Sequence, residues 1–209
     1  LRRHQREPGV PRAAVRRSLG VLAPDLLLRL HERRPDRYPV LLESVGGEAE
    51  LGRYDVLLAL PGKCLQLRPD GSLEGPCPSP GASSFLGCLD AWWSAEREPS
   101  PGPRDLPFTG GWFLYLGYEL AAEIEPRLRL PGSLLPRALA WRMKGAVVRD
   151  RLSGEAIACA EPQAPALLGA ELDADLAAAA GDARPFEGPL SLAVEEDEPG
   201  RVLSGVEGV

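Results

Sequence analysis

The sequence is poor in the residues from which metal sites and catalytic triads are built. Its 209 residues include two histidines, His4 and His31, and four widely spaced cysteines, Cys64, Cys77, Cys88 and Cys159. So few histidines leave little for a zinc centre or a Ser/His/Asp triad. The cysteines are too far apart for a CxxC knuckle and too few for a secreted disulfide scaffold, so reduced thiols are predicted.

A long hydrophobic run is also lacking. Nowhere do about 18 apolar residues follow one another, which is the length that a membrane-spanning helix needs. The 44% hydrophobic content is nevertheless enough for one globular domain to bury a core. With reduced cysteines, these features predict a soluble, cytoplasmic protein that has no membrane partner.

Positive charge gathers at the start of the chain and is outweighed by acids elsewhere. Residues 1–17 carry six arginines against the single acid Glu7, whereas the whole chain has a net charge of −6. An acidic body without a basic face argues against nucleic-acid binding, because phosphates are bound by clustered Lys and Arg. The start contains Pro8, Gly9 and Pro11 and no apolar signal region, so residues 1–23 are predicted to be a disordered basic extension.

The rest of the pattern alternates strands and helices without regular βαβ order. Apolar residues at helical spacing predict helices over residues 25–34 and 85–93, and an alanine-rich stretch over residues 164–180 is either a helix or a spacer. Strands are predicted over residues 38–44 and 53–60, in a hairpin at Asp70-Gly71, and in a meander over residues 138–161. The sequence therefore predicts an α+β domain with a largely antiparallel sheet and a few packed helices.

No catalytic constellation stands out. Glu119, Glu123 and Glu125 could hold a metal or act as acid and base, but an exposed i,i+4 helix face is the favoured interpretation. The pair Gly110-Gly111 lacks the Lys-Ser/Thr of a phosphate loop. It indicates backbone that approaches another segment closely.

Two motifs together resemble one known family. LLES at residues 41–44 is followed by RYD at residues 53–55, and LPFTGGWFLYLGYEL occupies residues 106–120. Their order and separation are similar to the LLES...RYS/RFD and PFxGGxxGxxGYDL signatures of the N-terminal domain shared by anthranilate synthase component I and aminodeoxychorismate synthase component I. The resemblance covers roughly residues 24–209 and is greatest to aminodeoxychorismate synthase component I.

In that family the N-terminal domain is an α+β structure that helps to form a tryptophan pocket. By position, the resemblance places six residues at such a pocket: Glu43, Ser44, Leu51, Gly52, Arg53 and Tyr54. A hydroxyl and backbone groups suit the polar head of an amino acid, and an apolar wall suits an indole. The alternative is that the leucines of LLES are core residues and that Arg53 only pairs with a surface carboxylate.

The chain departs from the family pattern at several positions. Trp112 and Phe113 stand where small residues are usual, Glu119 replaces an aspartate, and Leu51 stands where an aromatic residue is common. Bulk at these positions could fill the pocket and prevent tryptophan binding.

Catalysis in the family belongs to a C-terminal half, whose opening stretch, GDxxQVxxS, does not occur in this sequence. The resemblance implies a domain over residues 24–188 and, over residues 189–209, the start of the segment that leads to the missing chorismate-binding half. It implies no catalytic residue, no metal site and no bound cofactor in this chain. The parent enzyme would use chorismate, Mg²⁺ and a glutamine amidotransferase subunit.

Three functions stay open at this point. The first is the N-terminal, non-catalytic domain of aminodeoxychorismate synthase component I, which serves para-aminobenzoate and folate biosynthesis. The second is the corresponding domain of anthranilate synthase component I. The sequence segment DLPFTGG and the short connection between LLES and RYD favour the first function over the second. The third is a non-enzymatic module that binds an amino acid, so whether the chain belongs to an enzyme is open.

Overall fold

Seven strands and four α-helices make up the described part of the chain. The structure is a computed structural model, and it describes residues 14–44, 52–78, 81, 83–97, 106–130, 134–164 and 168–181. In chain order the elements are β1 (Val15–Val21), α1 (Leu26–Arg33), β2 (Val40–Leu42), β3 (Tyr54–Leu67), β4 (Leu73–Glu74), α2 (Phe85–Glu96), β5 (Gly111–Leu116), the 3₁₀ turn η1 (Tyr118–Leu120), α3 (Ala121–Ile124), β6 (Ala138–Asp150), β7 (Glu155–Ala160) and α4 (Ala170–Gly181). All strand pairs are antiparallel, so the α+β prediction is confirmed.

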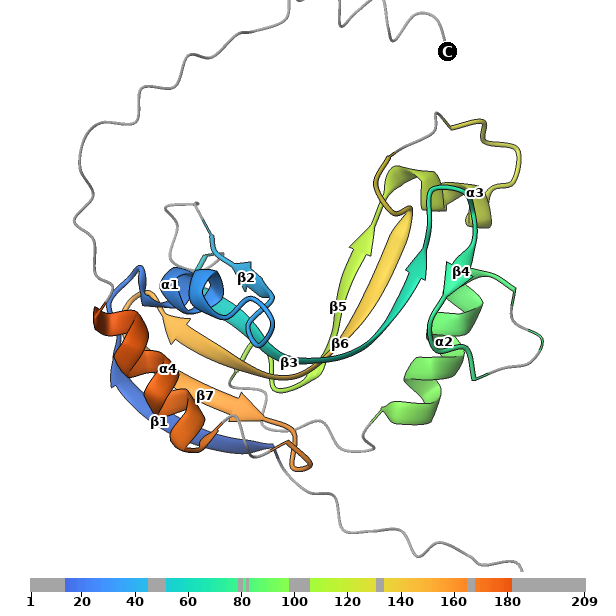
Figure 1. Cartoon of the computed structure of the whole chain (residues 1–209). Coiled ribbons are helices and arrows are strands. Elements are labelled where there is room, and N and C mark those ends of the chain that lie inside the picture. The colour runs from blue at the N-terminus through green and yellow to red at the C-terminus, as the bar shows by residue number, and fades with distance from the viewer. Residues whose placement is uncertain are drawn as a thin grey trace, which may run out of the picture.

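Two long strands, β3 and β6, run through the whole sheet and divide it into two lobes (Figure 1). In the first lobe the order is β1-β7-β6-β3-β2, and α1 and α4 lie beside the sheet. In the second lobe β5 pairs with the first half of β6, and β4 pairs with the end of β3. The register of β3 against β6 shifts between Pro61 and Cys64, where the two lobes meet. A β-bulge of this kind bends a strand and increases its twist.

The first lobe buries apolar side chains on both faces of its sheet. On one face, α1 and α4 pack on the strands through residues that include Leu27, Leu30, Leu57, Val147 and Leu172. The other face carries a second cluster, which includes Val56, Leu58, Met143, Ala146 and Val148. Burial on both faces explains why these strands read as nearly continuous apolar runs.

The beginning of the described chain forms a strand, which was not predicted. The disordered extension expected over residues 1–23 is wrong for residues 15–21, which form β1 and pair with β7 from Val15 opposite Ala160 onward. Arg17 forms an ion pair with Asp173 of α4 and donates a hydrogen bond of 2.9 Å to the carbonyl of Leu168. Arg16 and Arg17, two of the six arginines that indicated a basic extension, therefore belong to an edge strand, whereas the other four lie outside the described residues.

The core of the second lobe lies between α2 and the sheet. Phe85, Cys88 and Trp92 of α2 pack against β3 and β6, and the Trp92 ring meets the Trp112 ring edge-on at 5.5 Å. Cys88 forms a disulfide with Cys77, so the prediction of reduced thiols is wrong for this pair; Cys64 and Cys159 are free. The disulfide fastens the loop before α2 to the first turns of that helix. No helix in the described ranges has the length and apolar character to cross a membrane.

Candidate functional site

A polar cavity of about 470 Å³ lies in the first lobe, where β2 ends and β3 begins. Its described lining residues are Pro24, Glu43, Ser44, Asp55, Arg149 and Arg151. Glu43 and Ser44 follow β2 directly, whereas Asp55 and Arg149 lie opposite each other on β3 and β6. Arg151 begins the turn after β6. Four segments that are distant in the sequence therefore converge on one cavity.

The buried charges of the cavity are paired. Arg149 Nη1 donates a hydrogen bond of 3.1 Å to Asp55 Oδ2, and Arg149 Nε donates one of 3.2 Å to the carbonyl of Leu22. On the other side of the same carboxylate, Arg151 Nε lies 3.7 Å from Asp55 Oδ1. The Asp55 carboxylate thus interacts with two guanidinium groups, and their positive charges offset the cost of burying it in the strand. Removing Asp55 would leave Arg149 as a buried cation without its partner.

Arg151 and Glu43 are the charged groups of the cavity that keep contact with solvent. The Arg151 side chain is 37% exposed, compared with 10% for Arg149. Arg151 Nη1 donates to the carbonyl of Ser44, and at 3.2 Å to the carbonyl of Gly52. The guanidinium therefore holds the end of the β2 segment beside the start of β3. Its exposed edge is available to an anionic group that enters the cavity.

The six residues placed at a pocket by the family resemblance have different surroundings. Glu43 and Ser44 line the cavity, and Gly52 contributes its carbonyl to Arg151. Leu51 lies outside the described residues. Ligand binding by these residues stays a prediction.

Arg53 and Tyr54 lie outside the described lining of the cavity. Arg53 donates from Nε and Nη2 to Asp150 Oδ2, at 2.9 and 2.7 Å, and its guanidinium lies 5.0 Å from the centre of the Tyr54 ring. These hydrogen bonds from Arg53 hold the pKa of Asp150 below its ordinary value. Tyr54 packs at the edge of the apolar cluster that contains Val56 and Val148. The described contacts of Arg53 match the alternative interpretation, in which it pairs with a surface carboxylate.

Sequence reasoning missed Asp55, Arg149 and Arg151 as cavity residues. A signal was present, because Asp55 interrupts the apolar run of β3, and Arg149 does the same near the end of β6. A charged residue within a buried strand needs a partner of opposite charge. The identity of that partner depends on the β3–β6 register, which the sequence does not show.

The arrangement fits the head of an α-amino acid. A free carboxylate can meet the exposed edge of Arg151, and an ammonium can meet Glu43, an acidic residue that lines the same cavity. The hydroxyl of Ser44 adds a group that both donates and accepts hydrogen bonds. A metal centre is not indicated, because the described ranges contain no group of three His, Cys, Asp or Glu side chains that could hold an ion.

The glycine pair of the second motif has a structural role, as predicted. Gly110 has φ of +137°, and a Cβ at this position would lie 2.5 Å from the Glu161 side chain. Glu161 forms an ion pair of 2.6 Å with Arg142, which also stacks on the Trp112 ring at 4.3 Å. The glycine therefore permits the close approach of the segment before β5 to the ion pair between buried Arg142 and partly buried Glu161.

Glu123 caps α2, and this contact was missed when the acidic cluster was interpreted as an exposed face. Its two carboxylate oxygens accept hydrogen bonds from the N–H groups of Phe85 and Leu86, at 2.8 and 3.1 Å. The hydroxyl of Ser84 accepts from Gly87 N–H at 3.1 Å. Three of the N–H groups that a helix start leaves unpaired are thus satisfied by two side chains.

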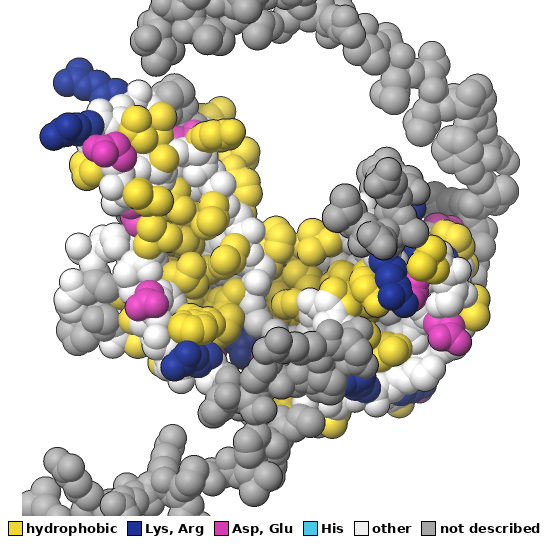
Figure 2. Space-filling model, turned by 180° about the vertical axis from the view of Figure 1, so that it is seen from behind, with side chains coloured by type: hydrophobic (Ala, Val, Ile, Leu, Met, Phe, Trp, Pro, Cys, Tyr) yellow, Lys and Arg dark blue, Asp and Glu magenta, His cyan; other side chains and the backbone are white. Residues whose placement is uncertain are grey.

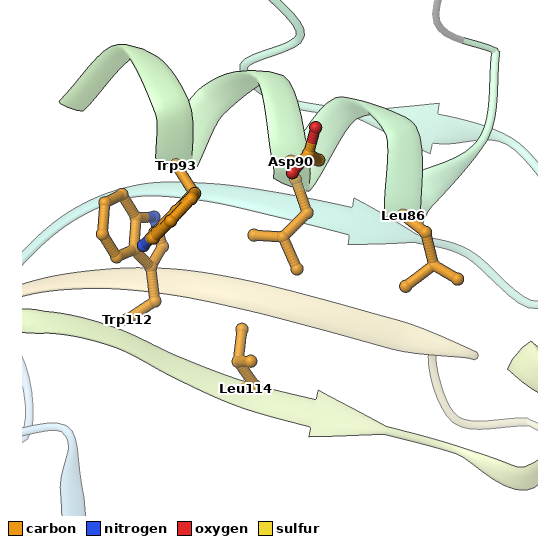
Figure 3. Close-up of a pocket in the computed structure, with 6 residues that line it drawn as sticks. Leu86, Asp90, Trp93, Trp112 and Leu114 are labelled. Carbon is orange, nitrogen blue, oxygen red and sulfur yellow. The ribbon is translucent and has the colours of Figure 1, made fainter. Parts of the chain in front are cut away.

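A second, apolar cavity of about 420 Å³ lies between α2 and β5. Figure 3 shows Trp112 and Leu114 projecting from β5 toward the helix, and Leu86 and Trp93 projecting from the helix toward β5. Leu89 and Asp90 complete the described lining. Trp93 remains 43% exposed and Leu114 45% exposed, so this cavity is open to solvent.

Comparisons with known proteins give a weak likeness. No protein-family model and no curated protein matches the chain. Among solved structures, the chain is similar to anthranilate synthase component I from Streptococcus pneumoniae, with a TM-score of 0.44 and 18% identity. The match covers 68% of this chain and 31% of that chain. A likeness at this level assigns no function.

Proposed function

We propose that this chain is the N-terminal, non-catalytic domain of a chorismate-utilising synthase component I, and that its polar cavity binds an α-amino acid, with tryptophan as the first candidate. The observation that carries the proposal is the place of Glu43 and Ser44. The LLES motif predicted that these residues lie at a pocket, and both line a cavity that also contains the partly exposed guanidinium of Arg151.

The proposed ligand pose follows from the charges of the cavity. Arg149 is committed to Asp55 and to the carbonyl of Leu22, so Arg151 is the guanidinium left to receive a carboxylate. The ammonium then lies toward Glu43. Charge-assisted hydrogen bonds of this kind are roughly twice as strong as neutral ones, so a ligand needs both charged groups to bind well.

Calorimetric titration of the 209-residue chain tests the cavity. L-Tryptophan should bind with a saturable isotherm, whereas tryptamine and indole-3-propionate should bind at least about tenfold more weakly, because each lacks one charged group. Glu43→Gln should weaken tryptophan binding by a similar factor. Arg53→Met is the matched control and should leave binding unchanged, because Arg53 is bonded to Asp150.

The outcome that overturns the amino-acid site is specific. Absence of heat with tryptophan and with other α-amino acids would show that the cavity is not such a site. Equal losses in Glu43→Gln and Arg53→Met would show that the binding lies elsewhere. A saturable isotherm in the chain alone also supports the third function, a module that binds an amino acid by itself.

The parent activity is tested separately, through the gene and its product. If the reading frame continues past Val209 into a GDxxQVxxS-like stretch, the longer protein should convert chorismate in the presence of ammonia and Mg²⁺. We propose aminodeoxychorismate as its product, made with a glutamine amidotransferase partner as the source of ammonia, because DLPFTGG and the short LLES–RYD connection favour that family branch. Anthranilate as the product would select the alternative branch, and no conversion of chorismate would refute both.

A further inference from the structure

The strand β5 has a free edge in the second lobe. Its residues Gly111–Leu116 pair with Met143–Ala138 of β6, and no other described strand pairs with β5. The six residues GWFLYL include no charge and no proline. Natural proteins usually protect a free edge with Lys, Pro or a bulge, because unpaired N–H and C=O groups invite pairing with another strand. Here none of these devices is present within the strand.

The hydrogen-bond pattern shows which backbone groups face this edge. Gly117 N–H donates to the carbonyl of Arg137 at 2.8 Å, so the groups of Gly117 point toward β6. Backbone groups of alternate residues point to opposite sides of a strand. The N–H and C=O groups of Trp112, Leu114 and Leu116 therefore point to the free edge.

This pattern is self-complementary. If β5 meets the β5 of a second copy antiparallel, with Leu114 opposite the partner's Leu114, then Trp112 lies opposite the partner's Leu116 on both sides of the axis. All three residues face the edge, so about six backbone hydrogen bonds can form. A two-fold axis at Leu114 places no like charges opposite each other, because β5 carries none.

Exposed apolar side chains gather beside the same edge. Figure 2 shows hydrophobic side chains collected over the lobe that contains β5. Those on or next to the strand are Leu114, Tyr115, Leu116 and Tyr118, which are 45%, 36%, 54% and 92% exposed. With Trp93, they offer about 500 Å² of apolar surface, or about 1,000 Å² for two copies, close to the lower limit of a specific dimer interface.

We propose that two copies of this chain associate through β5, antiparallel about a two-fold axis at Leu114, so that their sheets become one continuous sheet. Trp112, Leu114 and Leu116 share the face that α2 covers, and the cavity between α2 and β5 opens beside the axis. In the dimer, the partner's Leu116 lies next to Trp112 and covers this cavity. The interface is independent of the amino-acid site, because that site lies in the first lobe.

Analytical ultracentrifugation of the full chain over a concentration series tests the association. The wild-type chain should sediment as a dimer at micromolar concentration, and Leu114→Lys should raise the dissociation constant at least about tenfold, because two ammonium groups would meet at the axis. Leu152→Lys is the matched control: this leucine is 65% exposed in the first lobe and should have no effect. A wild-type monomer, or equal behaviour of the two variants, would overturn the proposal.

Cysteine cross-linking tests the register. Leu114→Cys should form an intermolecular disulfide on mild oxidation, because directly opposite residues have Cβ atoms about 5 Å apart. Leu116→Cys should not, because its copy is displaced by four residues, about 13 Å along the strand, which exceeds the reach of a disulfide. Oxidised wild type measures the background from Cys64. Efficient cross-linking of Leu116→Cys, or none of Leu114→Cys, would refute this pairing.

Discussion

The side-chain cap of α2 allows a quantitative prediction. In Glu123→Ala, the N–H groups of Phe85 and Leu86 lose the carboxylate that accepts them at 2.8 and 3.1 Å. Hydrogen bonds to a charged group contribute about 1.5–3 kcal/mol each when buried, and a carboxylate at a helix start adds about 0.3–1 kcal/mol. The site is only partly buried, so water can replace part of the cap. We therefore expect the free energy of unfolding to fall by about 2–3 kcal/mol in total.

Urea denaturation followed by circular dichroism measures this change. The midpoint should shift without a change of slope, since the amount of surface exposed on unfolding stays the same. Glu123→Gln keeps one acceptor oxygen and should lose only about 1 kcal/mol. Glu125→Ala is the control, because among the described residues the Glu125 carboxylate accepts a hydrogen bond from the exposed Arg127 N–H, at 3.3 Å, and none from α2. Equal midpoints for Glu123→Ala and Glu125→Ala would refute the assignment of Glu123 as the cap.

Three further changes have defined outcomes. Gly110→Ala should lower the melting temperature by several degrees, because a Cβ would lie 2.5 Å from Glu161 at a φ of +137°. Reduction by dithiothreitol should lower the free energy of unfolding by up to about 3 kcal/mol, because the Cys77–Cys88 link closes a loop over a sequence separation of 11; Cys77→Ser should then be insensitive to the reductant. Burial raises the pKa of Cys159 to about 11. At pH 9 its thiol should therefore react with iodoacetamide at least about tenfold more slowly in the folded protein than in urea. Because the folded pKa lies above the unfolded one, this thiol's contribution to stability is present below the unfolded pKa and is lost as the pH rises toward 11.

The candidate site shows where sequence reasoning reached its limit. The motif LLES directed attention to Glu43 and Ser44, and both line the cavity. The same motif reasoning placed Arg53 there, but its guanidinium is bonded to Asp150. A motif fixes the order of residues along the chain. It does not fix which residues of distant strands, such as Arg149 and Arg151, reach a given cavity.

The sequence by itself determined the local elements of this protein. Apolar periodicity placed α1, α2 and the strand segments within residues 53–60 and 138–161, because the face that a residue occupies depends only on its near neighbours. It did not show that β3 continues through Pro61 to Leu67 or that β6 continues through Lys144 and Gly145. The glycine pair at residues 110 and 111 likewise predicted that the backbone closely approaches another segment.

Only the tertiary structure decided which distant segments meet. Val15 lies opposite Ala160, and Asp55 lies opposite Arg149, through strand registers that no local pattern encodes. Residues 15–21 form a strand in which Arg17 pairs with an acid on α4 and the neighbouring apolar residues Val15 and Leu19 pack against a core cluster. Long-range register is set by the packing of the whole sheet and its helices, so the polar cavity, the α2 cap and the free edge of β5 exist only in the folded chain.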